Sequence, residues 1–222
     1  MPVEIEIKSL LGSADAADKL RAALLARGAA LTETSRQLNH YFTGDALAAL
    51  ADHAAAFLTS GDAASLAGIV GRARKASVRT RLLNELSLLI VKASLDDTTS
   101  ANGITRLEFE APAGGLSLDE LDAAVLKCGF AYQAKWSRQR ETYRVGEIAV
   151  SLDKNAGYGW LAEFEIMAED DRDAEAQAAR LRALMAELSA EELAQDRLER
   201  MFAYYNAHWP SYYGTEETFT VE

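Results

Sequence analysis

The stretch Val3-Glu4-Ile5-Glu6-Ile7-Lys8 alternates one apolar side chain with one charged side chain at every step. Because successive side chains of a β-strand point to opposite faces, this two-residue period predicts a strand with one apolar and one charged face. We expect the strand to cover residues 3–11. Its apolar face can pack on a core, so it is the charged face that needs an explanation.

The same alternation returns along most of the chain. It predicts further strands at residues 35–43, 76–83, 86–94, 104–111, 136–145, 148–153 and 160–167, with turns at Asn84-Glu85, at Gly146 and at residues 155–159. Helical patterns cover residues 13–27, 45–66, 117–127, 173–188 and 190–207, and the second of these is expected to split near residues 60–62. Ser117 with Glu120, and Ser189 with Glu192, have the spacing of capping boxes at two helix starts. About eight strands with helices between them predict an α+β fold, in which an antiparallel barrel or strongly curved sheet carries helices on its outside.

Length and composition favour one domain. The 222 residues are 49% hydrophobic, which is enough for a sizeable core. We expect a single domain over residues 1–222, with a helical insertion at about 45–70 and C-terminal helices at about 173–207. The Ala-rich helices could pack on the outside of the sheet or form a homodimer face.

Net charge and the search for targeting signals limit the classes of ligand and the cellular compartment that we expect. A net charge of −11 repels nucleic acid and anionic membranes, so an anionic ligand has to be small and held by a local basic cluster. We see no signal peptide and no membrane-spanning run, and Cys128 is the only cysteine, so we expect a cytoplasmic protein. His40, His53 and His208 are scattered, and we do not expect them to bind metal.

The charged strand faces contain seven acidic and seven basic residues and are therefore neutral as a set. Any one of these faces would ordinarily be a solvated surface. However, repeated Arg-x-Arg and Glu-x-Glu pairs place like charges two residues apart, and such pairs need a counter-charge. If the faces line a closed barrel, its lumen must be wet and suits a polyanion bound with divalent cations, because carboxylates bind Mg²⁺ or Mn²⁺ and arginines bind phosphoryl oxygens. The set is Glu4, Glu6, Lys8, Arg79, Arg81, Lys92, Arg106, Glu108, Glu110, Arg138, Arg140, Asp153, Glu163 and Glu165.

The order of these residues resembles the CYTH family, also called triphosphate tunnel metalloenzymes, which includes thiamine triphosphatases, inorganic triphosphatases and class IV adenylyl cyclases. Glu4-x-Glu6-x-Lys8 resembles the opening E-x-E-x-K signature of that family. The motifs that follow in the family's order are Gln37 with Tyr41-Phe42, Arg79-x-Arg81, Lys92, Arg106-x-Glu108-x-Glu110, Arg138-x-Arg140-x-x-Tyr143, Asp153, Gly157-x-Gly159 and Glu163-x-Glu165. The resemblance covers roughly residues 1–167. The pair Arg138 and Arg140 departs from the Lys-then-Arg order that is frequent in the family, and the helical insertion is longer than expected.

The resemblance implies an eight-stranded antiparallel tunnel and assigns roles to these residues. It implies metal binding by Glu4, Glu6, Asp153, Glu163 and Glu165; phosphate binding by Lys8, Arg79, Arg81, Lys92, Arg106, Arg138 and Arg140; and catalytic roles for Lys8, Glu108, Glu110 and Asp153. Arg106 is expected to orient the acids beside it.

The expected function is hydrolysis of a small-molecule triphosphate with Mg²⁺ or Mn²⁺, releasing orthophosphate. The substrate would be tripolyphosphate or an organic triphosphate such as a nucleoside or thiamine triphosphate. Two alternatives stay open: an adenylyl cyclase that makes cyclic AMP from ATP, and a binding module that holds a polyphosphate or nucleotide without turnover. Because phosphate binding alone does not need seven carboxylates, we rank the binding module last.

Overall fold

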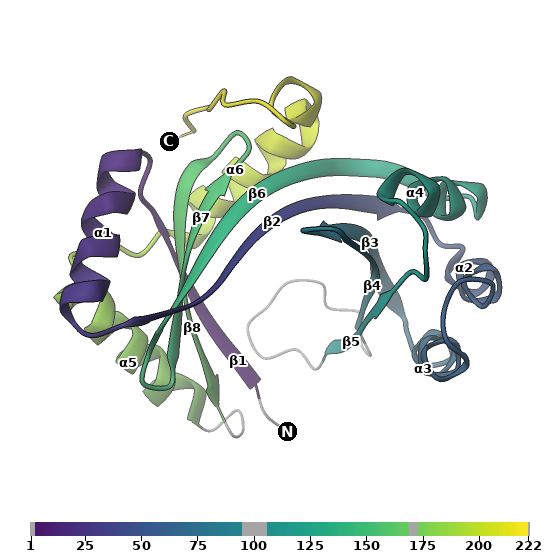
Figure 1. The fold of residues 1–222 in the computed structure, drawn as a ribbon, viewed down its shortest axis with the longest axis horizontal. Coiled ribbons are helices and arrows are strands. Elements are labelled where there is room, and N and C mark those ends of the chain that lie inside the picture. The colour runs from purple at the N-terminus through teal and green to yellow at the C-terminus, as the bar shows by residue number, and fades with distance from the viewer. Residues whose placement is uncertain (1–2, 95–105, 169–172, 222) are drawn as a thin grey trace. The chain divides into compact units, whose positions relative to one another are not determined.

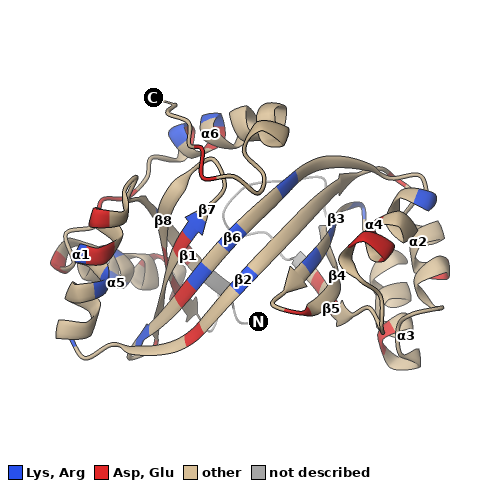
Figure 2. Cartoon of the chain, turned by 45° about the horizontal axis from the view of Figure 1, so that its top comes forward, with Lys and Arg blue, Asp and Glu red and all other residues tan. Residues whose placement is uncertain are grey.

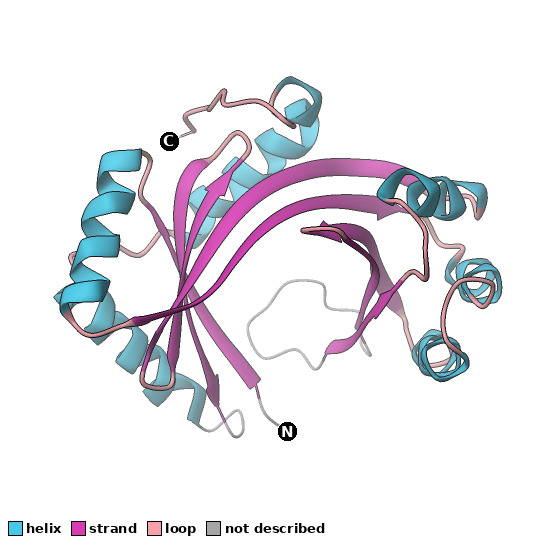
Figure 3. Ribbon diagram, viewed as in Figure 1, coloured by secondary structure: helices cyan, strands magenta, loops and turns pink. Residues whose placement is uncertain are grey.

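The computed structural model describes residues 3–94, 106–168 and 173–221, and Figure 1 shows its ribbon. Eight strands form one antiparallel sheet in the order β1-β8-β7-β6-β2-β3-β4-β5. Six α-helices accompany the sheet within these ranges, so the predicted α+β class is confirmed (Figure 3). None of these helices is long and apolar enough to cross a bilayer.

The elements follow one another along the chain with short connections. The strands are β1 (Val3–Leu10), β2 (Ala30–Thr43), β3 (Lys75–Leu83), β4 (Leu86–Ser94), β5 (Arg106–Pro112), β6 (Ala131–Val145), β7 (Ile148–Asn155) and β8 (Gly159–Ala168). The helices are α1 (Ala14–Ala26), α2 (Leu47–Ala54), α3 (Ser60–Val70), α4 (Leu118–Lys127), α5 (Ala174–Glu187) and α6 (Gln195–His208), followed by the short 3₁₀ helix η2 (Trp209–Ser211).

The sheet is not closed by hydrogen bonds. Strands β1 and β5 end the strand order, and over the described residues no ladder joins them. The expected antiparallel sheet is therefore present, whereas barrel closure through backbone pairing is not. Part of the β1 edge is covered instead by the segment before α6, where the Leu193 amide donates to the Lys8 carbonyl at 2.7 Å. A covered edge is protected from pairing with another chain.

Several element boundaries differ from the sequence-based ones. β2 begins at Ala30 and β6 at Ala131, about five residues earlier than the alternation predicted. In β2 the first five residues are exposed on both faces, so no buried face marks them in the sequence. α6 begins at Gln195, and the expected cap at Ser189 is wrong: Ser189 has a left-handed φ of 56°, and Glu192 pairs with Arg182. The capping box at Ser117 and Glu120 is confirmed.

The chain divides into two compact units, residues 1–36 with 137–222 and residues 37–136, and β2 and β6 have residues in both. In the first unit, α1 and α5 cover one face of β1, β8 and β7 (Figure 1). Leu24 of α1 and Leu181 of α5 are fully buried with Phe164 of β8. Because side chains alternate along a strand, this packing leaves the opposite face of the same strands to the charged residues.

The second unit is built in the same way. Its core joins α2, α3 and α4 to one face of β3, β4 and β5, with Leu50, Leu66 and Leu121 fully buried from the helices and Leu89 and Val91 from β4. The other face of these strands carries the second set of charged residues. Each unit therefore fixes its charged face by burying an apolar one.

The C-terminal tail is fastened to the turn between β7 and β8 in the first unit. Thr218 pairs with Gly157, and the Phe219 amide donates to the Gly157 carbonyl at 2.9 Å. Phe219 packs on Tyr158 and on Tyr205, which is fully buried. The aromatic residues of the tail therefore have a packing role in this structure.

Gly157→Ala is expected to destabilise the protein by about 2–4 kcal/mol, because an added Cβ meets Phe219 and Tyr205 at 2.8 Å and the φ of 75° disfavours a side chain. The matched control is Gly214→Ala, which has a φ of 74° but open space around the added atom, so it should cost only about 1 kcal/mol. Chemical denaturation of the two variants measures the difference. Equal losses would contradict close packing of the tail on the turn.

Candidate active site

The first charged face belongs to the first unit and is made of Glu6, Lys8, Arg138, Arg140, Asp153, Glu163 and Glu165. The strand register explains how these residues meet. Lys8 of β1 lies directly opposite Glu163 of β8, and Arg140 of β6 lies opposite Asp153 of β7. Figure 2 shows the basic and acidic positions mixed on these strands.

Asp153 is the most buried acid of this face, with its side chain 1% exposed. Arg140 binds it through two hydrogen bonds, Nε to Oδ1 at 2.7 Å and Nη2 to Oδ2 at 2.6 Å, and Arg138 Nη1 adds a third to Oδ2 at 3.2 Å. A two-point contact of this kind fixes the plane of the guanidinium. In this structure Asp153 thus orients the two arginines, while its predicted metal and catalytic roles stay predictions.

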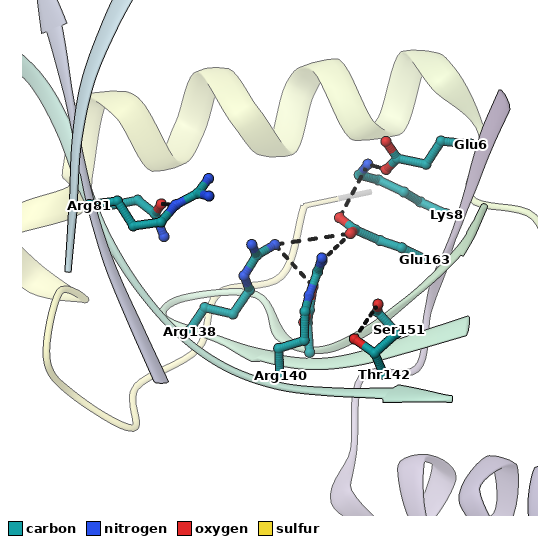
Figure 4. Close-up of polar contacts among 10 residues, drawn as sticks. Glu6, Lys8, Arg81, Arg138, Arg140, Thr142, Ser151 and Glu163 are labelled. Atoms are coloured by element: carbon teal, nitrogen blue, oxygen red, sulfur yellow. Dashed lines mark hydrogen bonds and ion pairs between the residues drawn. The ribbon is translucent and has the colours of Figure 1, made fainter. Parts of the chain in front are cut away.

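Glu163 lies at the centre of the face, within ion-pair distance of three cations. Lys8 Nζ is at 3.3 Å and Arg138 Nη1 at 4.0 Å, and Arg140 donates a hydrogen bond to the same carboxylate (Figure 4). Burial alone would raise the pKa of the Glu163 carboxyl, but the positive charges of Lys8, Arg140 and Arg138 outweigh burial and lower this pKa to about 2. Glu163 is therefore a permanent anion near neutral pH, held among cations.

Arg140 is affected in the opposite sense. Its burial would lower the pKa of the guanidinium, but the hydrogen bond to Asp153 and the charges of Glu163 and Asp153 raise it. Lys8 also pairs with Glu6, two residues before it on the same strand face. The face therefore balances its own charges while it holds several N–H donors close together.

Two hydroxyl groups on this face were not predicted as site residues. Thr142 Oγ1 and Ser151 Oγ are 3.2 Å apart, and Ser151 lies directly opposite Glu163 across the β7–β8 ladder (Figure 4). The two-residue spacing of Thr142 from Arg140, and of Ser151 from Asp153, was the signal that could have found them. They place neutral hydrogen-bonding groups next to the central carboxylate.

The residues predicted to bind metal meet only in part. Glu6 and Glu165 lie directly opposite each other across the β1–β8 ladder, and like charges in this position are destabilising without a counter-charge. Such paired carboxylates are the oxygen donors that Mg²⁺ and Mn²⁺ prefer, so this donor set fits a divalent cation. Over residues 3–94, 106–168 and 173–221, however, no three acids, histidines or cysteines converge as a metal cluster. The Glu4 side chain lies outside the described residues.

The second charged face belongs to the second unit and is made of Arg79, Arg81, Lys92, Glu108 and Glu110. Arg81 Nε donates to Asn39 Oδ1 at 2.6 Å, and its Nη1 is 3.3 Å from Glu110. Lys92 Nζ is 3.0 Å from Glu108 on the neighbouring strand. The side chains of Glu108 and Glu110 are 48% and 36% exposed, so these ion pairs are open to exchange with a ligand.

Arg79 is held differently. Its guanidinium lies over the ring of Tyr41, 4.5 Å from the ring centre, and Nε reaches Ser77 Oγ at 3.4 Å. Asn39 and Tyr41 are thus supports of Arg81 and Arg79 that received no predicted role, although the alternation of β2 places both on this face. The side chain of Arg106, predicted to orient the acids of β5, lies outside the described residues.

Comparison with known proteins identifies one family and several solved structures of similar fold. A family model described as the CYTH domain matches residues 2–197. No curated protein sequence matches the chain significantly.

The solved structures are similar at low sequence identity. A conserved hypothetical protein from Pyrococcus furiosus has a TM-score of 0.59 at 16% identity, with 85% of this chain and 92% of that chain covered. A Vibrio parahaemolyticus protein named as a candidate adenylate cyclase has a TM-score of 0.59 at 16% identity, with 90% and 97% covered. A Hippeastrum protein named as a candidate adenylyl cyclase with a dominant triphosphatase activity has a TM-score of 0.53 at 18% identity, with 91% and 96% covered. At such identities the likeness extends to the fold alone.

Replacing Glu163 should make the free energy of unfolding less dependent on pH between pH 6 and pH 3. A carboxyl whose pKa is lowered on folding stabilises the protein above its unfolded pKa of about 4.5, and this contribution is lost as the pH falls toward about 2. Glu163→Gln should therefore be destabilised at pH 6, and its deficit relative to the original protein should shrink by about 2 kcal/mol between pH 6 and pH 3. Urea denaturation at both pH values measures this. A deficit that does not change with pH would contradict the ionised, cation-bound state of Glu163.

Proposed function

The chain belongs to the CYTH family, and from this premise we propose that it hydrolyses a small-molecule triphosphate with the help of a divalent cation. The observation that carries the proposal is the position of Glu163 among Lys8, Arg138 and Arg140. An ordinary solvated sheet face would not bury an acid among three cations, because desolvating charges is costly. Such an arrangement keeps the three cations ordered before substrate binds. A polyanion can then take over some of the contacts that these cations make with Glu163.

The residues of the first charged face can be divided into those that would bind phosphate and those that would bind the metal. Lys8, Arg138 and Arg140 offer N–H donors that suit phosphoryl oxygens. Asp153 fixes the plane of Arg140 through two hydrogen bonds and accepts one from Arg138. Glu6 and Glu165, with Glu4 and Glu163 as further predicted ligands, would hold the metal through their carboxylate oxygens. When bound, Mg²⁺ or Mn²⁺ would neutralise the charge that develops on the phosphate oxygens.

The reaction we propose is in-line displacement. A water oxygen attacks the terminal phosphorus, the bond from this phosphorus to the bridging oxygen breaks, and the bridging oxygen keeps the electron pair as part of the diphosphate product. The cations of the first charged face stabilise the negative charge of both products. The resemblance to the family assigns water positioning to Glu108, Glu110 and Asp153, and Lys8 a catalytic contact; these roles are part of the proposal.

The adenylyl cyclase reading is the second candidate. It is supported by the names of the Vibrio and Hippeastrum proteins, which share the fold. In that case the ribose 3′-hydroxyl of ATP attacks the α-phosphorus and pyrophosphate leaves. We rank hydrolysis first because the sequence shows no motif that we can assign to adenine or ribose. A net charge of −11 also favours a small ligand over nucleic acid, and a lone cysteine suits action in the cytoplasm.

The direct test is incubation with tripolyphosphate, ATP or thiamine triphosphate, each with Mg²⁺, with Mn²⁺ and with excess chelator. We expect orthophosphate release from at least one of the three, lost when the chelator is present, measured colorimetrically. Cyclic AMP from ATP would move the cyclase to first place. Release from none of them, with tripolyphosphate still bound tightly, would favour the non-catalytic binding module.

Glu165→Gln should reduce turnover at least about 100-fold, because it removes one carboxylate from the opposed pair proposed to hold the metal. The matched control is Glu85→Gln, the same change at an exposed turn position, which should leave turnover unchanged. Circular dichroism checks that both variants fold. Near-normal turnover in folded Glu165→Gln would contradict the proposed metal ligand.

Arg81→Ala tests the second charged face in the same assay. Loss of its guanidinium should lower kcat/KM for the triphosphate by about 10–100-fold, because a charge-assisted contact to phosphate is removed. Arg72→Ala, at an exposed arginine away from the strands, is the control. Equal activity of the two variants would remove Arg81 from the binding residues.

A further inference from the structure

A second group of buried polar residues lies on the rear of the second unit, among the apolar residues. Its centre is Asp122 of α4, which is only 2% exposed. Thr80 Oγ1 donates to Asp122 Oδ1 at 2.5 Å, and Tyr132 OH donates to Oδ2 at 2.6 Å. His40 Nδ1 is 2.6 Å from Oδ2, and Lys135 Nζ is 3.7 Å from it. One carboxylate thus joins α4 to β2, β3 and β6.

The strand register connects this group with the second charged face. His40 and Thr80 are direct partners in the β2–β3 ladder, and both point to the rear, where each is at most 2% exposed. The pairs on either side of them, Asn39 with Arg81 and Tyr41 with Arg79, point to the opposite face. Asp122 therefore holds the residue pair His40–Thr80, which lies in the β2–β3 ladder between the two pairs that contain Arg79 and Arg81.

The contacts of the two arginines on the second charged face join the same two strands. The hydrogen bond from Arg81 Nε to Asn39 Oδ1 and the stacking of Arg79 on Tyr41 both join β3 to β2, as the rung at His40 and Thr80 does. A shift of β3 along β2, or a twist between them, would therefore change both arginine supports at once. Side chains move with the backbone that carries them. Contacts that hold His40 and Thr80 on the rear face therefore also hold the neighbouring residue pairs, whose side chains lie on the front face.

Asp122 is suited to this because its donors bind an ionised acceptor. Burial alone would raise the pKa of the Asp122 carboxyl, but the hydrogen bonds from His40, Thr80 and Tyr132 outweigh burial and lower this pKa. Hydrogen bonds to a charged acceptor are about twice as strong as neutral ones. A fully used carboxylate inside an apolar core also allows few alternative arrangements, since each would leave a buried donor unpaired.

We infer that Asp122, acting through Thr80 and His40, positions Arg79 and Arg81 for phosphate binding. This inference rests on the proposed function, because it needs a phosphate group as the ligand of the two arginines. Asp122 and Thr80 are positioning residues and contact no substrate themselves. The expected signature is weaker substrate binding with little change in turnover, since arginines that hold phosphate in both ground and transition states act mainly on KM.

Thr80→Val tests the inference, because it keeps the shape of the side chain and removes the donor to Asp122. We expect KM for tripolyphosphate to rise about tenfold while kcat changes less than about twofold. Thr80→Ser restores the hydroxyl and should return KM to within about twofold of the original value. Asp122→Asn, whose amide has one acceptor oxygen for these donors, should change KM in the same direction as Thr80→Val.

A loss of stability alone must be separated from loss of positioning. Leu66→Ala of α3 is the control, since Leu66 is fully buried in the same core and makes none of the contacts of Asp122. It should lower the melting temperature and leave KM unchanged. A rise in KM in Leu66→Ala equal to that in Thr80→Val would overturn the inference, because core destabilisation would then explain both.

A measurement without catalysis separates the inference from the proposed function. Hydrogen exchange at Arg81 Nε–H, followed by nuclear magnetic resonance, reports on the bond to Asn39. We expect about tenfold faster exchange in Thr80→Val and Asp122→Asn but not in Thr80→Ser or Leu66→Ala. Unchanged exchange would overturn the inference even if the protein is an active triphosphatase, as would faster exchange with unchanged KM. If the original protein releases no phosphate, the proposed function fails, whereas the exchange rates still decide whether Asp122 holds Arg81.

Discussion

The ionised carboxylate of Glu163, held by Lys8, Arg138 and Arg140, is the interaction on which the first unit's charged face depends. Three cations brought together on one face of the sheet would repel one another, and three carboxylates would do the same. Placing one acid among the cations and a second, Asp153, behind the arginines makes the cluster stable without a ligand. The same balance leaves N–H donors near the surface of the cluster, where a phosphate can compete for them.

This arrangement constrains the fold around it. The charged strands are held in place by burial of their other face, which α1 and α5 provide behind β1, β7 and β8. In the second unit, α2, α3 and α4 do the same for β3, β4 and β5. There the rear face also includes a group of polar residues centred on Asp122, whose contacts to Thr80 and His40 lie behind the two arginines of the front. In each unit, the packing on one side of the strands thus sets the geometry of the charged residues on the other side.

Much of this could be predicted from the sequence because it depends on a period of two. The alternation through Glu6, Lys8, Glu163 and Glu165 defines both the strands and their charged side before any pairing is known. The distribution of roles within the face could not be predicted in this way, since it depends on which residues lie opposite across the ladders. Asp153 is an example: its position opposite Arg140 follows from the register and not from its spacing, and its metal and catalytic roles stay predictions. Helical spacing places Asp122 on the buried face of α4 with Leu118, Leu121 and Val125, but its partners His40 and Thr80 come from distant strands and could not be predicted from that spacing.

We propose that the first charged face binds a polyanion and a divalent cation together. Titration calorimetry measures this directly, with tripolyphosphate added alone, Mg²⁺ added alone, and tripolyphosphate added in the presence of Mg²⁺ at a temperature where turnover is slow. If the two ligands bind together, tripolyphosphate should bind at least about tenfold more tightly with Mg²⁺ present, and Glu165→Gln should remove this difference. Tight binding of tripolyphosphate that is indifferent to Mg²⁺ would contradict it.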